Sequence, residues 1–218
     1  MAKKRYHLPQ LNFNQIERVM SEQKYNTAIE LINSANSKDP NIETCDGKEW
    51  PKELLYSHRM LEMIDRYAPD ADDAQKLAVQ AQHIERWKSP RSDYPMNKKG
   101  YYQWRTNLYD FHAETTAVLL EKAGYDSDFI ERVKLAVGKK SLKTNTDTQM
   151  LEDVIALVFI EHYMLAFAEK HAEYSEEKWL DIIRKTWRKM TDRAHQFVLD
   201  GHITLPEPLV PLIQKALS

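Results

Sequence analysis

Apolar residues recur at the three- and four-residue spacing of an amphipathic α-helix along almost the entire chain. No convincing stretch alternates between polar and apolar residues as a half-buried strand does, and only five glycines interrupt the pattern. With 218 residues, the chain is long enough for one large domain with its own hydrophobic core. The spacing therefore predicts an all-α, single-domain bundle of about eight to ten helices.

Capping residues, prolines and turn-forming pairs divide this pattern into segments. Asn14 is expected to cap a short first helix, and residues 37–50 are expected to form a loop because their Asp-Pro and Asp-Gly pairs favour turns. The most apolar segment, residues 150–172, is expected to be the central buried helix. The predicted helices span residues 14–20, 26–36, 51–68, 71–87, 101–124, 126–138, 150–172, 175–190 and 191–201, followed by a proline-broken tail.

The charge and the cysteine content narrow the classes of function. The net charge is −2, so no overall field draws the chain to nucleic acid or to a membrane, and any anion site must be a local patch. The single cysteine, Cys45, excludes an intrachain disulfide and fits a reducing cytoplasm. The longest strongly apolar run, Val154 to Ile160, is far shorter than the ~20 residues that cross a bilayer. Residues 1–13 lack the apolar segment of a secretory signal, so we expect a soluble cytoplasmic protein.

Four of the predicted helices each carry a potential metal ligand: His58, His83, His112 and Asp153. Divalent metals are held by imidazole and carboxylate groups that rigid elements bring together, so four converging helices would provide a site for Mn, Fe, Mg or Zn. For any one histidine on an apolar face, the alternative is a core residue that hydrogen-bonds a backbone carbonyl. No motif of a zinc protease, a P-loop, a serine hydrolase or a dinucleotide-binding fold is present.

The order of these residues along the chain resembles that of a known superfamily. The segments YSHRM, AQHIERW, FHAETTAVLLEKAG and TQMLEDVIALV, within about residues 56–167, resemble the layout of the HD superfamily of metal-dependent phosphohydrolases. The resemblance implies an HD-like helical core over residues 51–172. It implies that residues 1–50 are N-terminal helices and loop packed on that core, and that residues 173–218 are C-terminal helices. It also implies that the four ligand candidates hold a divalent metal.

The chain departs from the HD pattern at several positions. Gln82 stands where the superfamily has a histidine ligand, and His83 stands where it has the adjacent aspartate. Lys139 and Lys140 stand where many members have a further histidine. An amide is a poor ligand for a transition metal, and an ammonium repels a cation. The metal site is therefore either altered, with His58, His83 and Asp153 as ligands, or lost.

A second resemblance extends over nearly the full length of the chain. The phrases NSANSKDPN, PKELLYSHRM, AQHIERWKSPRSDYP, GYYQWR, FHAE, LEDVIALVF and IIRKTWRKM resemble the uncharacterised family called domain of unknown function 4202. These phrases are specific, and they imply kinship with that family. The family has no established reaction, so the resemblance implies no chemistry.

Cationic and aromatic residues alternate from the end of one predicted helix into the start of the next. We call these residues the basic-aromatic belt: Arg86, Trp87, Lys88, Arg91, Tyr94, Lys98, Lys99, Tyr101, Tyr102, Trp104 and Arg105. Arginine matches phosphate geometry and planar rings offer stacking surfaces for a nucleobase, so the belt favours a phosphorylated ligand. The predicted ligand-binding residues are Gln82, Arg86, Arg91, Arg105, Lys139 and Lys140. Alternatively, the tryptophans pack the loop onto the core, and Arg91 ties it down through backbone carbonyls.

These features support three alternative functions. The first is a metal-dependent HD-like hydrolase of a nucleotide or other phosphorylated small molecule, in which the metal lowers the pKa of a bound water and Glu85 or Glu114 serves as the base. The second is a non-catalytic HD-like module that binds a nucleotide or an RNA phosphate and holds no metal. The third is an HD-type iron oxygenase, because the resemblance implies that such histidine–carboxylate pockets also host oxygenases. The sequence does not indicate an oligomeric state.

Overall fold

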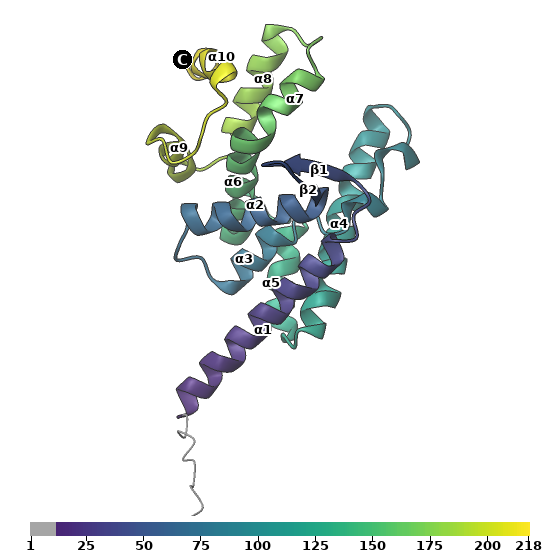
Figure 1. Cartoon of the computed structure of the whole chain (residues 1–218), viewed down its shortest axis with the longest axis vertical. Helices are drawn as coiled ribbons and strands as arrows, with labels where there is room; N and C mark the ends of the chain where they lie inside the picture. The colour runs from purple at the N-terminus through teal and green to yellow at the C-terminus, as the bar shows by residue number, and fades with distance from the viewer. Residues whose placement is uncertain (1–11) are drawn as a thin grey trace, which may run out of the picture.

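The structure is a computed structural model, described for residues 12–218, and these residues form ten α-helices and one β-hairpin (Figure 1). The predicted all-α, single-domain bundle is confirmed. The first half of the chain forms α1 (Phe13–Asn36), β1 (Ile42–Cys45), β2 (Lys48–Pro51), α2 (Lys52–Tyr67), α3 (Asp73–Gln80) and α4 (Lys98–Lys122). The second half forms α5 (Ser127–Val137), α6 (Thr146–Val158), α7 (Met164–Lys170), α8 (Glu176–Trp187), α9 (Asp192–Leu199) and α10 (Val210–Leu217).

The N-terminal region forms one helix where the sequence predicted two. The cap of α1 is Asn12 rather than Asn14: the Asn12 side chain accepts a hydrogen bond from the backbone N–H of Gln15 at 3.0 Å, and the Gln15 side chain accepts one in return. The residues between the two predicted helices, SEQKY, contain neither glycine nor proline, so nothing ends the helix there. In Figure 1 α1 extends away from the body of the molecule, at the end opposite α10.

The segment of residues 37–50 was wrongly predicted to be a loop throughout, because it contains most of the β-hairpin. Ile42 of β1 lies opposite Pro51 of β2 in an antiparallel register. The intervening turn is Asp46-Gly47, whose φ angles of 51° and 72° are the two positive values that a type I′ turn needs. The Asp-Gly pair was recognised as a turn, but strands of four residues are too short for an alternating pattern to be evident.

The helix predicted over residues 71–87 ends much earlier, at Gln80. Its start is a capping box, in which the Asp72 side chain accepts from the backbone N–H of Gln75 at 3.1 Å. Its continuation is blocked at Glu85, which has a φ of 49° and donates its backbone N–H to the Asn36 side chain of α1 at 3.0 Å. Gln82 and His83 therefore lie in the turn that follows α3, not within a helix.

Most other boundaries agree with the sequence pattern. α2 begins directly after Pro51 and ends at Tyr67, two residues before Pro69. α5 is capped by Asp126 and is followed by Gly138, as predicted. α4 begins three residues earlier than predicted, because the Asn97 side chain accepts from the backbone N–H of Gly100 at 2.8 Å and caps the helix.

Two clusters of buried apolar side chains form the core. One joins α2, α6 and the C-terminal helices and includes Met60 and Leu157, while the other joins α1, α3, α4 and α5 and includes Ile32 and Leu77. The prediction that residues 150–172 are buried holds for α6, but the helix is not continuous. A π-helical segment, η3 (Phe159–Tyr163), separates α6 from α7. Such segments are rare and are frequently found at functional sites.

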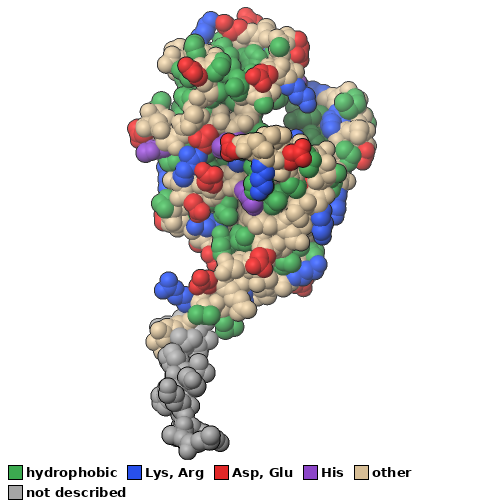
Figure 2. All heavy atoms as spheres, viewed as in Figure 1, with side chains coloured by type: hydrophobic (Ala, Val, Ile, Leu, Met, Phe, Trp, Pro, Cys, Tyr) green, Lys and Arg blue, Asp and Glu red, His purple; other side chains and the backbone are tan. Residues whose placement is uncertain are grey.

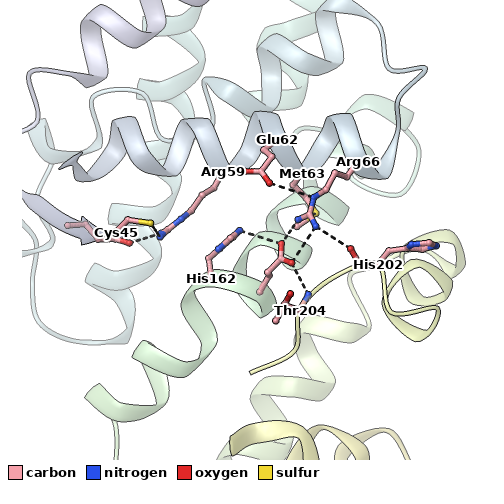
Figure 3. A network of polar contacts seen from close by, with 10 residues as sticks. Cys45, Arg59, Glu62, Met63, Arg66, His162, His202 and Thr204 are labelled. Carbon is pink, nitrogen blue, oxygen red and sulfur yellow. Dashed lines mark hydrogen bonds and ion pairs between the residues drawn. The ribbon is translucent and has the colours of Figure 1, made fainter. Parts of the chain in front are cut away.

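A polar network attaches the C-terminal region to α2 and η3 (Figure 3). Its centre is the buried Glu161 carboxylate, which forms an ion pair with Arg66 and accepts a hydrogen bond from the backbone N–H of Thr204 at 2.8 Å. Arg66 also donates to the backbone carbonyl of His202 at 3.2 Å. Together these bonds hold the segment between α9 and α10 against η3.

None of the helices within residues 12–218 is both long enough and apolar enough to span a bilayer. The expectation that the N-terminus is no secretory signal concerns residues 1–13, nearly all of which lie outside the described residues.

Candidate functional site

A cavity of about 620 Å³ lies among α2, α4, η3, α7 and α8, with α6 and the turn after α3 completing its wall. Figure 2 shows the molecule hollowed beside the β-hairpin, where hydrophobic side chains surround an opening towards α4. The aromatic side chains in the lining are Tyr56, Tyr101, Tyr109, Phe159, Tyr163 and Phe167. A volume of this size accommodates a small organic molecule.

The charged lining is strongly unbalanced. Five cations face the cavity: Lys52, Arg86, Arg105, Lys139 and Lys189. Only two carboxylates accompany them, those of Glu53 and Glu152. The whole chain has a net charge of −2, so this cavity is a local concentration of positive charge on a protein that is otherwise slightly acidic. Walls of low dielectric strengthen the attraction of such a cavity for an anion.

Arg86 is held in place by an imidazole and an indole, and the imidazole is held in turn by a carboxylate. Its Nη1 donates to Nε2 of His83 at 2.8 Å, and its guanidinium lies over the Trp104 ring at 5.1 Å. Because a guanidinium only donates, Nε2 of His83 carries the lone pair and Nδ1 carries the proton. That Nδ1 faces a Glu53 carboxylate oxygen at 3.3 Å, and the His83 ring stacks on Tyr56 at 4.2 Å. Burial and the nearby cations keep the pKa of His83 well below its ordinary value, so the ring is neutral.

The two arginines of the cavity repel each other and have no carboxylate partner. Within residues 12–218, neither the Arg86 nor the Arg105 guanidinium has a carboxylate oxygen within 4.0 Å. Burial lowers the pKa of Arg86, Glu53 opposes that shift, and the positive charge of Arg105 adds to it. Arg105 donates to the Tyr109 hydroxyl and lies over the same ring at 5.2 Å. Two partly buried cations that lack a paired carboxylate are destabilising, and a bound anion would relieve this.

Lys139 reaches the cavity from a strained backbone position. Its φ is 54°, a left-handed conformation that costs a non-glycine residue about 1 kcal/mol or more. Its ammonium pairs with the Glu152 carboxylate, and both side chains are largely buried. Burial lowers the pKa of Lys139, and the pair with Glu152 opposes that shift. The ammonium also lies 5.6 Å from the centre of the Tyr109 ring. Lys139 and Arg105 therefore both lie against the same aromatic ring.

His112 and Gln82 supply the uncharged polar groups of the wall. Nδ1 of His112 lies 2.8 Å from the backbone carbonyl oxygen of Ile84, and burial lowers the pKa of the ring to about 3. His83 and His112 lie close together, with ring centres 6.0 Å apart. Among the described residues, Nε2 of His112 and Oε1 of Gln82 are buried and have no hydrogen-bond partner.

Half of the twelve residues singled out in the sequence line this cavity: Gln82, His83, Arg86, Arg105, His112 and Lys139. His58 lies outside it and packs edge-on against Trp50 at 5.5 Å. Asp153 also lies outside it, where its Oδ1 accepts from the Thr191 backbone N–H at 2.9 Å and its Oδ2 accepts from the Tyr67 hydroxyl at 2.8 Å. The structure therefore brings two of the four predicted metal ligands together and separates the other two from them.

The remaining predicted site residues have other contacts. Glu85 pairs with Lys88 at 2.6 Å, Glu114 with Lys134 at 2.9 Å, and Lys140 with Asp110 at 3.2 Å. Arg91 donates to the backbone carbonyls of Tyr94 at 3.0 Å, of Pro95 at 2.7 Å and of Asn97 at 3.3 Å. It therefore ties down its own loop, which is the alternative role that the sequence allowed.

The described residues do not fit the divalent metal that the HD resemblance implies. Residues 12–218 contain no group of three or more His, Cys, Asp or Glu side chains that could hold a metal ion. The lone pair of His83 already accepts from Arg86, so this imidazole has none to offer a cation.

Sequence reasoning missed four important residues of the wall: Glu53, Tyr56, Glu152 and Tyr163. Glu152 was detectable as a carboxylate inside a strongly apolar helix, but its neighbour Asp153 was chosen instead. Glu53 lies in the first turn of α2 and is buried, with 6% of its surface exposed. No local pattern separates such a residue from an exposed glutamate at a helix start, where acidic residues are common.

The fold and the site together define a class: an all-α protein built around one cation-rich, partly aromatic cavity. The chain belongs to the family described as "Domain of unknown function (DUF4202)", whose model matches residues 26–213. The matched region includes every residue that lines the cavity and begins within α1. No curated protein and no solved structure matches the chain.

Proposed function

We propose that the protein binds a phosphorylated small molecule with a planar group, such as a nucleotide, in this cavity. The observation that carries the proposal is the pair of partly buried arginines, Arg86 and Arg105, without a carboxylate partner among the described residues. A bound phosphate would neutralise both and remove their mutual repulsion. The guanidinium of Arg86 is held before the ligand arrives, so little side-chain entropy is lost on binding.

The aromatic part of the wall suits a planar group. Tyr101 is 43% exposed beside the cavity, and Tyr109 and Phe159 are half-buried in its lining. Aromatic side chains bind planar rings by stacking and tolerate any base, because every base has a π-face. The combination of stacking surfaces with clustered cations favours a nucleotide over an inorganic anion.

We further propose that the central region is an HD-like core that has kept the pocket and lost the metal site. Two histidines on the HD-like layout, His83 and His112, lie side by side in the cavity. Gln82 and Lys139, which replace expected ligands, line the same cavity. The positions that would hold a metal in the superfamily therefore coincide here with those that would hold an anion. We assign such a binding module to the cytoplasm, in agreement with its single cysteine.

Titration calorimetry with the four nucleoside monophosphates, phenyl phosphate and inorganic pyrophosphate tests this proposal. Replacement of Arg105 with methionine is expected to weaken binding about 30-fold, by the ~2 kcal/mol of a charge-assisted hydrogen bond. Lys140→Met is the matched control, because this lysine is also cationic but pairs with Asp110 outside the cavity. Dissociation constants weaker than about 1 mM for every probe, or equal losses in both variants, would overturn the proposal.

The same experiments separate the alternatives. A metal-dependent hydrolase or an iron oxygenase requires a stoichiometric metal in the purified protein, and iron rather than manganese indicates the oxygenase. An RNA-binding role predicts that a short single-stranded oligonucleotide binds more tightly than the mononucleotides. The proposal made here predicts the opposite order of affinity.

A further inference from the structure

Two polar side chains in the cavity wall are almost completely buried and incompletely bonded. His112 is 2% exposed and Gln82 is 5% exposed. Among the described residues, Nε2 of His112 and Oε1 of Gln82 have no hydrogen-bond partner. Buried polar groups are normally paired, so an unpaired group calls for an explanation, and a molecule in the adjoining cavity would supply the partner.

The hydrogen-bonding role of His112 follows from its other nitrogen. Nδ1 lies 2.8 Å from the Ile84 carbonyl oxygen, and because a carbonyl only accepts, Nδ1 carries the proton. Burial, reinforced by the nearby His83, lowers the pKa of the ring to about 3, so the ring does not take up a second proton near neutral pH. Nε2 is therefore a buried lone-pair acceptor in a ring that lines the cavity.

The cations of the cavity do not fill this acceptor. Nη1 of Arg86 donates to His83, Nη2 of Arg105 donates to Tyr109, and the Lys139 ammonium pairs with Glu152. An acceptor that stays open beside so many donors needs a donor from outside the chain.

On the basis of the function proposed above, we infer that the ligand carries a neutral hydrogen-bond donor, a hydroxyl or an amino group, which donates to Nε2 of His112 while its phosphate meets Arg86 and Arg105. Gln82, in the same cavity wall, offers a second acceptor at Oε1. The substrate class is thus a phosphorylated compound with free hydroxyl or amino groups, such as a nucleoside monophosphate. Phenyl phosphate has neither an alcoholic hydroxyl nor an amino group and lacks that donor.

A matched pair of ligands tests this inference. Adenosine monophosphate carries an amino group and two ribose hydroxyls, and purine 2′,3′-dideoxyriboside 5′-monophosphate has the same charge and ring system but none of these donors. The unmodified protein is expected to bind the first at least about tenfold more tightly by calorimetry, because the second leaves the acceptors unpaired.

His112→Asn is the informative variant. The asparagine amide replaces Nδ1 as donor to Ile84, so the bond inside the wall is kept, while the acceptor at Nε2 is lost. The tenfold preference is expected to disappear in this variant. Gln82→Met, which keeps the size of the side chain and removes its oxygen, is expected to reduce the preference by a smaller factor.

Each outcome bears on a different part of the proposal. Equal binding of the two ligands by the unmodified protein would overturn the inference and leave the anion site intact. A preference that survives unchanged in His112→Asn would place the donor elsewhere and overturn it as well. Absence of binding of either ligand would instead remove the proposed function on which the inference depends.

Discussion

Two buried polar clusters of this protein show opposite states of hydrogen bonding. Around Asp153, Oδ1 accepts from the Thr191 backbone N–H at 2.9 Å and from Gln149 at 3.1 Å, while Oδ2 accepts from the Thr191 hydroxyl at 2.6 Å and the Tyr67 hydroxyl at 2.8 Å. Both carboxylate oxygens are thus satisfied by the chain itself. Such a cluster fixes α6 against α9 and needs nothing from outside.

The cavity shows the reverse. Its arginines lack carboxylate partners among the described residues, and the acceptors of His112 and Gln82 are unpaired there. The comparison teaches that burial alone does not distinguish a structural polar residue from a binding one. The distinction lies in whether the protein completes the hydrogen bonds of the group.

The largest expected effect is at the satisfied cluster. Asp153→Ala leaves Thr191 and Tyr67 without their acceptor and removes the bond that holds the start of α9, so the free energy of unfolding should fall by about 3 kcal/mol. Urea denaturation measures this loss. Nucleotide affinity of the folded fraction should stay within about twofold of the unmodified protein, and a selective loss of binding would contradict the structural role.

Each unit by which the pH is lowered below the ordinary histidine pKa is expected to have a smaller effect. The native His112 ring takes up a proton only near pH 3, whereas the unfolded chain takes it up near 6.5, so between these values the unfolded state binds more protons. Stability should therefore decrease as the pH falls through this range, by about 1.4 kcal/mol per pH unit for this residue. The raised pKa of Glu53 acts in the opposite direction and reduces the net slope.

The His112→Asn variant isolates this contribution. Urea denaturation at a series of pH values should give a shallower dependence for the variant than for the unmodified protein. Parallel dependences would mean that the imidazole titrates normally in the folded state, which would contradict its burial as a neutral ring.

The smallest expected effect concerns the stability of a cavity variant. Arg105→Met removes a cation that repels Arg86, so the loss of packing is offset and the free energy of unfolding should change by less than roughly 0.5 kcal/mol. Thermal unfolding without ligand measures it. A destabilisation as large as that of Asp153→Ala would show that Arg105 is structural, and the contrast between the two clusters would be lost.

The helical architecture could be predicted because it depends on local periodicity and caps. The cap at Asp126 and the stop at Gly124 are examples, since both act within one turn of their helix. The early end of α3 was not predictable in this way. The turn that follows α3 is held by Asn36, which lies 49 residues from Glu85 in the sequence and accepts its backbone N–H.

The candidate site was predictable only as a list of polar residues in apolar surroundings. Glu152 and Asp153 are neighbours on one helix and point about 100° apart, so one lines the cavity and the other meets α9. Which of the two faces a pocket is decided by the packing of other helices. For the same reason, His58 and His83 are equally plausible from the sequence as residues of the site, but only His83 reaches the cavity.

The π-helical turn η3 contacts both the cavity and the segment between α9 and α10. Phe159 and Tyr163 at its ends form part of the cavity wall, and Glu161 between them holds the backbone of Thr204. A π-helical turn holds one residue more than an α-helical turn, so deleting a single residue from it would restore ordinary helical pitch and leave the chain beyond it almost unrotated. Phe167 would then keep its direction, so a one-residue change in chain length would remove the wide turn from the cavity wall without altering Arg86 or Arg105.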